Sequence, residues 1–298
     1  MDLPVTIIGG YLGAGKTTLI NHLLRHNEGL RLAILVNEFG ELPIDADLIE
    51  AEDGGLMSIS GGCVCCAYGS DMIGVLEDIA AMEPRPDHVL LEASGVALPA
   101  SIAVTVGMMQ GFRSDGVIVL ADAEQIRKTA ANSYLADTVD RQIEQADLLL
   151  LTKADLVPDK ALEEVTAWLS AKAPATRVLP VSRGELPVRA VVGAVPFPQR
   201  GGPSPATGHA RFDSVLLEPS GPVDAEALAR ALAAEPSVTR AKGFVQTGDG
   251  LALIHVVGQR GAVEAVSGER RVGIICIGLR GELDAPALHA LVAPRTTA

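Results

Sequence analysis

The segment Gly10–Thr17, with the sequence GYLGAGKT, decides the fold of the first part of the chain. It fits the pattern G-x-x-x-x-G-K-[ST], follows the apolar run Val5–Ile8 and opens a helical pattern over Lys16–Arg25. This order predicts a phosphate-binding loop, because glycines let backbone N–H groups converge on phosphate oxygens and the helix N-terminus adds a favourable dipole. The context disfavours the alternative of a glycine-rich turn with an incidental lysine.

The residues of this loop have separate expected roles. Lys16 is expected to reach the β- and γ-phosphates of a nucleotide, and the Thr17 hydroxyl is expected to bind Mg²⁺. We therefore place Lys16 among the catalytic residues and Thr17 among the magnesium ligands. The predicted nucleotide-binding residues of the loop are Gly10, Gly13, Ala14, Gly15, Lys16, Thr17 and Thr18.

A second strand pattern, His88–Glu92, ends in a carboxylate where a magnesium-binding acid would stand at the carboxyl edge of a parallel sheet. Glu92 is the candidate second contact to Mg²⁺, direct or through water. Gly95 would then direct its N–H to the γ-phosphate, and both residues join Lys16 in the predicted catalytic set. The alternative is a solvent-facing glutamate at the end of a strand, since Asp is the usual residue here.

The apolar run before Thr152 is followed by Lys153 and Asp155, a T-K-x-D motif. A carboxylate at Asp155 can accept from N1–H and the 2-amino group of guanine, whereas adenine offers neither donor, and Lys153 would lie along the base. Thr152 replaces the usual Asn and is expected to lose some bracing of the loop, which leaves the strength of the preference for GTP over ATP open. The loop Val181–Gly184 could close over the base. A helix cap is the alternative role for Asp155.

The segment Ser60–Cys66, with the sequence SGGCVCC, puts three thiols on one glycine-led loop. Thiolates prefer Zn²⁺, Cu⁺, Co²⁺ or Ni²⁺ to Mg²⁺, and three of them supply most of a tetrahedral site. Redox chemistry and inert packing are the alternatives. Glu38 could add a ligand, or its loop could simply be solvated. The predicted metal ligands are Cys63, Cys65, Cys66 and Glu38. Cys276, in an apolar run, is predicted to be a core residue.

The composition limits the class of protein. The chain has 298 residues, of which 48% are hydrophobic and 20% charged, which is typical of a folded protein with two domains. A formal net charge of −13 disfavours nucleic-acid binding, because phosphate backbones attract clustered Lys and Arg. No run reaches transmembrane length and no leader pattern opens the chain. We expect a cytoplasmic protein with reduced thiols and no membrane or nucleic-acid partner.

The domain organisation follows from the pattern of apolar runs. Residues 1–195 are expected to form an α/β domain, a parallel sheet flanked by helices. Residues 196–208 read as a Pro/Gly-rich linker, and residues 209–298 as a small α+β domain. Strands are expected near Val5–Ile8, Leu32–Val36, His88–Glu92, Gly116–Ala121, Leu148–Thr152 and Arg177–Val181, then Phe212–Leu217, Gly243–Gln246, Leu251–Val257 and Val272–Ile277. Helices are expected at Lys16–Arg25, Met72–Met82, Leu162–Lys172 and Asp224–Ala234.

These motifs together resemble the CobW family of P-loop metal-chaperone GTPases. The resemblance is carried by Gly10–Thr17, Asn37–Glu41, Gly62–Cys66, Glu92–Gly95 and Thr152–Asp155, and Thr239–Phe244 looks like the R-A-K-G-F segment of the family's C-terminal domain. Ala93 and Thr152 depart from the family pattern, and no His-rich tract is present.

The resemblance implies a P-loop NTPase sheet with a CobW-like C-terminal domain, hydrolysis of GTP with Mg²⁺, and binding of Zn²⁺, or of Co²⁺, at the Cys-x-Cys-Cys motif. It also implies delivery of that metal to a client metalloprotein or a cofactor-synthesis enzyme, and is compatible with a homodimer. We expect GTP to order residues 37–45 while the thiol loop closes on the metal, which requires different metal affinities in the GTP and GDP states. The alternatives are a P-loop kinase that prefers ATP and a nucleotide-binding metal sensor without transfer activity.

Overall fold

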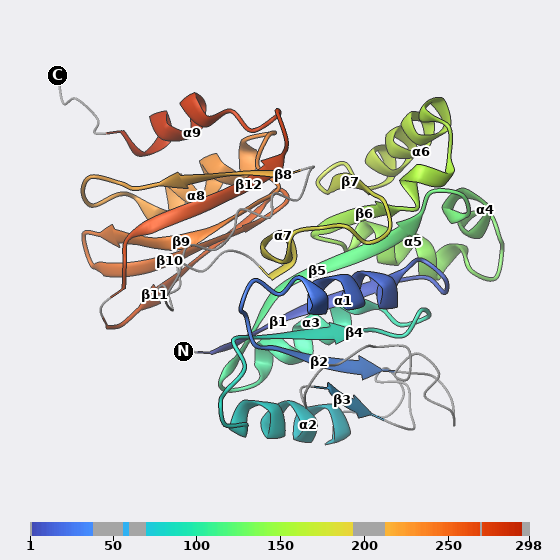
Figure 1. Ribbon diagram of the computed structural model, residues 1–298, viewed down its shortest axis with the longest axis horizontal. Coiled ribbons are helices and arrows are strands. Elements are labelled where there is room, and N and C mark those ends of the chain that lie inside the picture. The colour runs from blue at the N-terminus through green and yellow to red at the C-terminus, as the bar shows by residue number, and fades with distance from the viewer. Residues whose placement is uncertain (1, 38–55, 60–69, 193–211, 269, 294–298) are drawn as a thin grey trace. The chain divides into compact units, whose positions relative to one another are not determined.

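The structure is a computed structural model that describes residues 2–37, 56–59, 70–192, 212–268 and 270–293. It divides into two compact units, Met1–Leu186 and Pro187–Ala298 (Figure 1). The linker expected at residues 196–208 lies outside the described residues, so its place stays a prediction. No helix in the described ranges is long and apolar enough to cross a lipid bilayer.

The first unit is built on a seven-stranded sheet in which every strand pair is parallel. The strands are β1 (Leu3–Gly10), β2 (Leu32–Asn37), β3 (Leu56–Ile59), β4 (His88–Glu92), β5 (Phe112–Asp122), β6 (Leu148–Thr152) and β7 (Arg177–Val181). Their order is β3-β2-β4-β1-β5-β6-β7, so β1 is the central strand. Every residue of β1, β4 and β6 is buried, as in strands that are covered on both faces. The predicted parallel sheet is confirmed with its six expected strands, and β3 is an addition.

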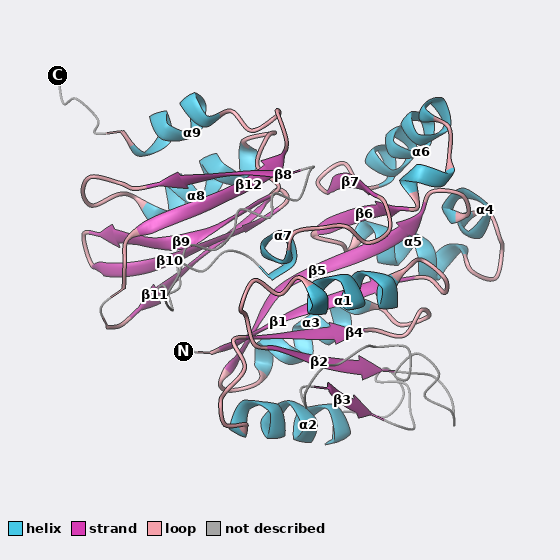
Figure 2. Cartoon of the chain, viewed as in Figure 1, coloured by secondary structure: helices cyan, strands magenta, loops and turns pink. Residues whose placement is uncertain are grey.

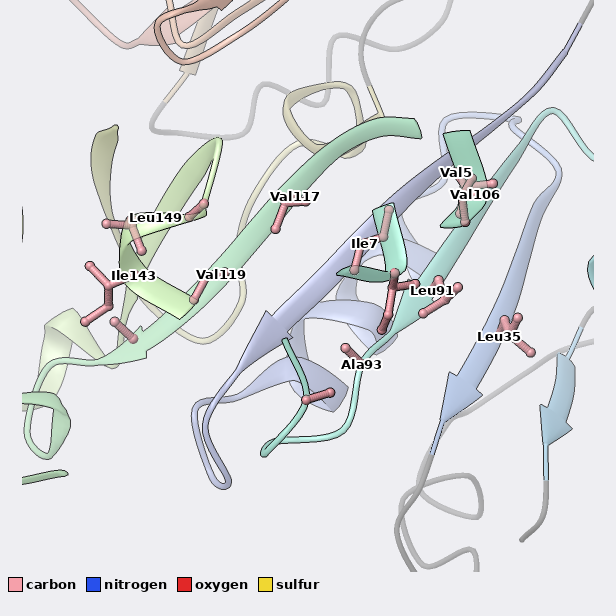
Figure 3. Packing of buried hydrophobic residues seen from close by; sticks show 14 of the residues in the cluster. Val5, Ile7, Leu35, Leu91, Ala93, Val106, Val117, Val119, Ile143 and Leu149 are labelled. Carbon is pink, nitrogen blue, oxygen red and sulfur yellow. The ribbon is translucent and has the colours of Figure 1, made fainter. Parts of the chain in front are cut away.

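Helices cover both faces of this sheet (Figure 2). They are α1 (Lys16–Arg25), α2 (Ser70–Ala81), α3 (Pro99–Met108), α4 (Ile126–Ala130), α5 (Ala136–Glu144) and α6 (Asp159–Lys172), with a 3₁₀ turn, η2, at Ala154–Leu156. On one face, Val5 and Ile7 of β1 belong to the same core cluster as Val106 of α3 and Ile143 of α5 (Figure 3). Residues two apart on a strand point to the same face, so this core follows directly from the continuous apolar strands.

The second unit contains a five-stranded antiparallel sheet in the order β11-β10-β9-β12-β8. The strands are β8 (Phe212–Leu217), β9 (Arg240–Thr247), β10 (Gly250–Val257), β11 (Arg260–Val266) and β12 (Gly273–Leu279), and the helices are α7 (Val188–Val192), α8 (Ala225–Ala234) and α9 (Ala285–Val292). Asp224 caps α8 by accepting from the Ala227 N–H at 2.9 Å. The predicted small α+β unit is confirmed, and β11, α7 and α9 are additions.

Strand β9 carries the R-A-K-G-F segment, with alternate residues on opposite faces. Ala241 lies in the core cluster that also contains Leu228 and Leu232 of α8. Arg240 and Lys242 occupy the other face of the strand, and both are fully buried. The Arg240 guanidinium donates to the Val191 carbonyl, which ties α7 to this sheet.

Candidate nucleotide-binding site

The phosphate loop joins the end of β1 to the start of α1 and depends on glycine at three positions. Gly10, Gly13 and Gly15 have φ values of 130°, 77° and 92°, a region that residues with side chains rarely adopt. Gly10 also lies directly against β5, where an added Cβ would collide with the carbonyl oxygen of Leu120. The chain can therefore turn sharply here and keep its backbone close to the sheet.

The lysine of this loop folds back over it. Lys16 is only 8% exposed, and its Nζ donates to the Gly10 carbonyl at 3.1 Å. Gly15 is the N-cap of α1 and supplies no side-chain cap, and the first turn contains no acidic residue. An N-terminus without a side-chain cap, beside a buried ammonium group, suits an anion.

The segment that follows β4 runs against the phosphate loop. Glu92 pairs in register with Ile8 of β1, and the Ala93 N–H donates to the Ile8 carbonyl at 2.8 Å. Glu92 is 3% exposed, so the alternative of a solvent-facing glutamate is wrong. An added Cβ at Gly95 would lie 2.8 Å from the backbone nitrogen of Leu12. Glu92 and Gly95 thus belong to the same edge of the sheet as the phosphate loop.

A glutamine that the sequence analysis missed holds this segment from the other side. Gln142 lies on α5, is 2% exposed, and donates from Nε2 to the carbonyls of Gly95 at 3.1 Å and Ala97 at 2.7 Å. Gln142 could have been found from its helical spacing, because it lies on the same buried face of α5 as Val139 and Ile143. A polar residue on a buried helical stripe requires a partner.

Thr152, at the end of β6, is linked to the phosphate loop. Its hydroxyl donates to the Ala14 carbonyl at 2.8 Å and also lies 3.2 Å from the Ala121 carbonyl. Thr152, which was expected to lose some bracing as a replacement for Asn, therefore still reaches the phosphate loop through its shorter side chain. The T-K-x-D turn and the phosphate loop are joined by a buried hydrogen bond.

Lys153 has a partner that the sequence analysis did not assign. Its backbone is left-handed, with φ of 57°, and its Nζ lies 2.6 Å from Oδ2 of Asp122. Asp122 ends β5 and is 8% exposed, and its Oδ1 accepts from the Glu124 N–H at 2.8 Å. Asp122 could have been found as a carboxylate at the end of an apolar strand, which is the pattern that identified Glu92 as a candidate.

Asp155 stands in η2, with its side chain 30% exposed and Oδ2 lying 3.7 Å from Nε of Arg183. Arg183 belongs to the loop after β7 and has a side chain that is 80% exposed. The same loop packs on α1, because an added Cβ at Gly184 would lie 3.1 Å from Cα of Leu19. The loop that was expected to close over a base therefore lies beside Asp155.

The predicted transition-metal ligands Cys63, Cys65, Cys66 and Glu38 lie outside the described residues, and their role stays a prediction. Within the described ranges, no group of three or more His, Cys, Asp or Glu side chains could hold a metal ion. Cys276 is fully buried on β12, and this burial raises the pKa of its thiol to about 12. The prediction that Cys276 is a core residue is confirmed.

The fold and this edge of the sheet define a P-loop nucleotide-binding protein. The family model for the CobW/HypB/UreG nucleotide-binding domain matches residues 4–180, and that for the cobalamin synthesis protein CobW C-terminal domain matches residues 212–293. The chain belongs to the CobW/HypB/UreG family, as the resemblance of its motifs predicted.

Curated relatives share about a third of their aligned residues with this chain. The zinc chaperone CobW of Pseudomonas aeruginosa is 34% identical over 64% of this chain and 60% of its own length. The zinc chaperone YjiA of Escherichia coli is 32% identical over 62% and 59%, and the zinc-regulated GTPase metalloprotein activator 1 of Schizosaccharomyces pombe is 34% identical over 55% and 42%. The chain thus spans less than two thirds of each of these relatives.

Among solved structures, that of the zinc-bound YjiA GTPase from E. coli covers 99% of this chain and 100% of its own, at 22% identity and a TM-score of 0.45. HypB from Helicobacter pylori in complex with nickel covers 61% of this chain and 80% of its own, at 20% identity and a TM-score of 0.44. These likenesses add nothing to the family assignment.

Proposed function

We propose that this protein is a GTPase that binds a transition metal, most readily Zn²⁺, and passes it to a client metalloprotein or a cofactor-synthesis enzyme. The observation that carries the GTPase part is the hydrogen bond from Thr152 to Ala14, which joins the T-K-x-D turn to the phosphate loop. A base held by Asp155 and phosphates held by the loop would then sit on one braced support. A carboxylate at this turn favours guanine, since guanine offers two adjacent donors and adenine offers none there.

The residues at this edge fit hydrolysis of the terminal phosphate. Charge spreads over the γ-phosphate oxygens in the transition state of phosphoryl transfer, so fixed donors are the main source of rate. The Lys16 ammonium and the Gly95 N–H would supply such donors. The Thr17 hydroxyl and the Glu92 carboxylate are hard oxygen ligands of the kind that Mg²⁺ prefers, and would hold it against the β- and γ-phosphates. When bound, Mg²⁺ neutralises part of the developing charge.

The metal-carrying part of the proposal rests on the thiols and on the relatives. Cys63, Cys65 and Cys66 together offer three thiolates, which suit Zn²⁺ better than Mg²⁺. Two of the relatives described above are named zinc chaperones. Cys63 follows Ile59, the last residue of β3, by only four positions in the sequence. The carboxyl end of β3 lies on the same edge of the sheet as the phosphate loop, three strands away or about 14 Å at the usual strand spacing.

The test is the Zn²⁺ affinity of the reduced protein with a GTP analogue, with GDP and without nucleotide. The matched variant is Cys63→Ser/Cys65→Ser/Cys66→Ser, which keeps the buried Cys276. We expect thiol-dependent binding that changes at least tenfold between nucleotide states, or about 1.4 kcal/mol. Equal affinity in the GTP and GDP states would refute gating by nucleotide. Binding that survives loss of the thiols would refute the metal site.

The base preference is tested separately by competition of ATP and GTP against a fluorescent GDP analogue. We expect GTP to compete far better than ATP, because only guanine offers the two N–H donors that the Asp155 carboxylate can accept. A preference for ATP, with phosphoryl transfer to a small molecule, would instead identify a kinase.

A further inference from the structure

Gln142 is a buried amide on α5, a helix whose other buried residues are apolar. Val139 and Ile143 flank it on the buried face of α5 and belong to the main core cluster. An amide buried to this extent destabilises the fold if its hydrogen-bonding groups are not satisfied. Its presence on this stripe therefore points to a specific purpose for its hydrogen bonds.

Both hydrogen bonds of the Gln142 amide go to one short segment. Nε2 donates to the carbonyls of Gly95 and Ala97, two residues apart in the chain. A carbonyl accepts and cannot donate, so these two partners fix which end of the amide faces the segment. The turn between them is closed by the Ala97 N–H, which donates to the Ser94 carbonyl at 2.9 Å.

The segment is thus held from two sides. Its start is tied to β1 by the hydrogen bond between Ala93 and Ile8, and its end is tied to α5 by Gln142. Between these ties, Gly95 lies against the backbone of Leu12 in the phosphate loop. Fixing the Gly95 carbonyl restricts the rotation of the glycine, which has the widest backbone freedom of any residue.

We propose that Gln142 is a positioning residue for the terminal phosphate of the nucleotide. It holds Gly95 against the phosphate loop, so that the Gly95 N–H is preorganised for the γ-phosphate. The assignment rests on the proposed GTPase function. A donor misplaced by about 1 Å can cost roughly a hundredfold in rate, so loss of this support affects hydrolysis although Gln142 touches no reacting atom.

The test replaces Gln142 with methionine, which has a similar length and no donor. The matched control is Gln145→Met, the same change three residues further on, at the C-cap of α5. Affinities for GDP and for a non-hydrolysable GTP analogue are measured with kcat for phosphate release and with the thermal midpoint. GDP has no γ-phosphate, so we expect Gln142→Met to leave GDP affinity within about twofold. We expect it to lower the affinity for the GTP analogue and kcat, each by about tenfold. We expect Gln145→Met to leave both affinities and kcat unchanged.

The other outcomes are distinct. Equal weakening of GDP and of the GTP analogue, or an unchanged kcat with unchanged affinities, would overturn the assignment and leave Gln142 as a structural residue. If Gln142→Met does not fold, Gln142→Leu, which is uncharged and also lacks a donor, gives the same comparison. If the wild-type protein binds nucleotide without hydrolysing GTP, the proposed function fails, and a selective loss of triphosphate affinity in Gln142→Met still supports the positioning role.

Discussion

Replacing Thr152 with valine removes one hydroxyl while it keeps the shape of the side chain. The hydroxyl is shared between the carbonyls of Ala14 and Ala121, and Thr152 is 6% exposed. Leaving a buried carbonyl without its donor costs about 1–3 kcal/mol. We expect the free energy of unfolding to fall by about 1–2 kcal/mol. Because Ala14 belongs to the phosphate loop, we also expect the affinities for GDP and for a GTP analogue to fall about tenfold, which corresponds to about 1.4 kcal/mol.

The assay combines calorimetric titration of both nucleotides with denaturant unfolding. Thr152→Ser keeps a hydroxyl and should stay within about twofold of the wild-type affinity. The matched control is Thr176→Val, since Thr176 is 7% exposed and its hydroxyl donates to the Ala146 carbonyl at 2.9 Å. Thr176 precedes β7, at the opposite edge of the sheet, so its loss should lower stability and leave nucleotide binding unchanged. Wild-type affinity in Thr152→Val, or an equal loss of affinity in Thr176→Val, would refute the reasoning.

Three further substitutions test separate parts of the structure. Gly95→Ala puts a Cβ 2.8 Å from the Leu12 nitrogen, about 0.7 Å inside an ordinary contact. The value of kcat for GTP should therefore fall roughly tenfold or more, and by a larger factor than the affinity for GDP. A wild-type rate of phosphate release would contradict this. Asp155→Asn replaces one hydrogen-bond acceptor with a donor. It should lower the affinity for GTP roughly 10–100-fold and leave the affinity for ATP unchanged in the same competition assay. Burial raises the Cys276 pKa from 9.0 to about 12, so the unfolded chain loses this proton first and the free energy of unfolding should fall as the pH rises through that window. Denaturant unfolding should show a shallower fall in Cys276→Ala, and an identical slope would disprove the linkage.

The strong local patterns predicted most of the first unit. The strand, glycine-rich loop and helix around Gly10–Thr17 depend on residues that are neighbours in the chain, and α1 spans the predicted residues. Strand β3 escaped prediction because four residues at the edge of a sheet are too few to show a period. Helix α3 escaped because PASIAVTVGM is apolar on nearly all sides and lacks the polar face by which a helix is recognised.

The side-chain partners at the site could not be predicted in the same way. Thr152 and Ala14 are separated by 138 positions, and Gln142 and Ala97 by 45. Such contacts depend on which strands are neighbours, and the sequence motifs do not specify the order β4-β1-β5-β6. A motif comparison reports Thr152 only as a departure from Asn, although its hydroxyl performs the bracing. Asp122 was missed for a related reason, since its partner Lys153 becomes visible only when β5 and β6 are paired.

The central place of β1 has a consequence for synthesis of the chain. Its eight residues are all buried, and its two neighbours are β4 and β5, with Gly10 paired to Leu120. The residues that complete its hydrogen bonds are therefore made about 110 positions after it, which takes roughly 5–20 s at usual rates of translation. Until β4 is made, with Glu92 about 84 positions after its partner Ile8, this apolar strand has no neighbour on either side. From then until β5 is made it has a neighbour on one side only. Thr152, which braces the phosphate loop, and Asp155 are made later still, so the loop gains these supports only after most of the first unit has been translated.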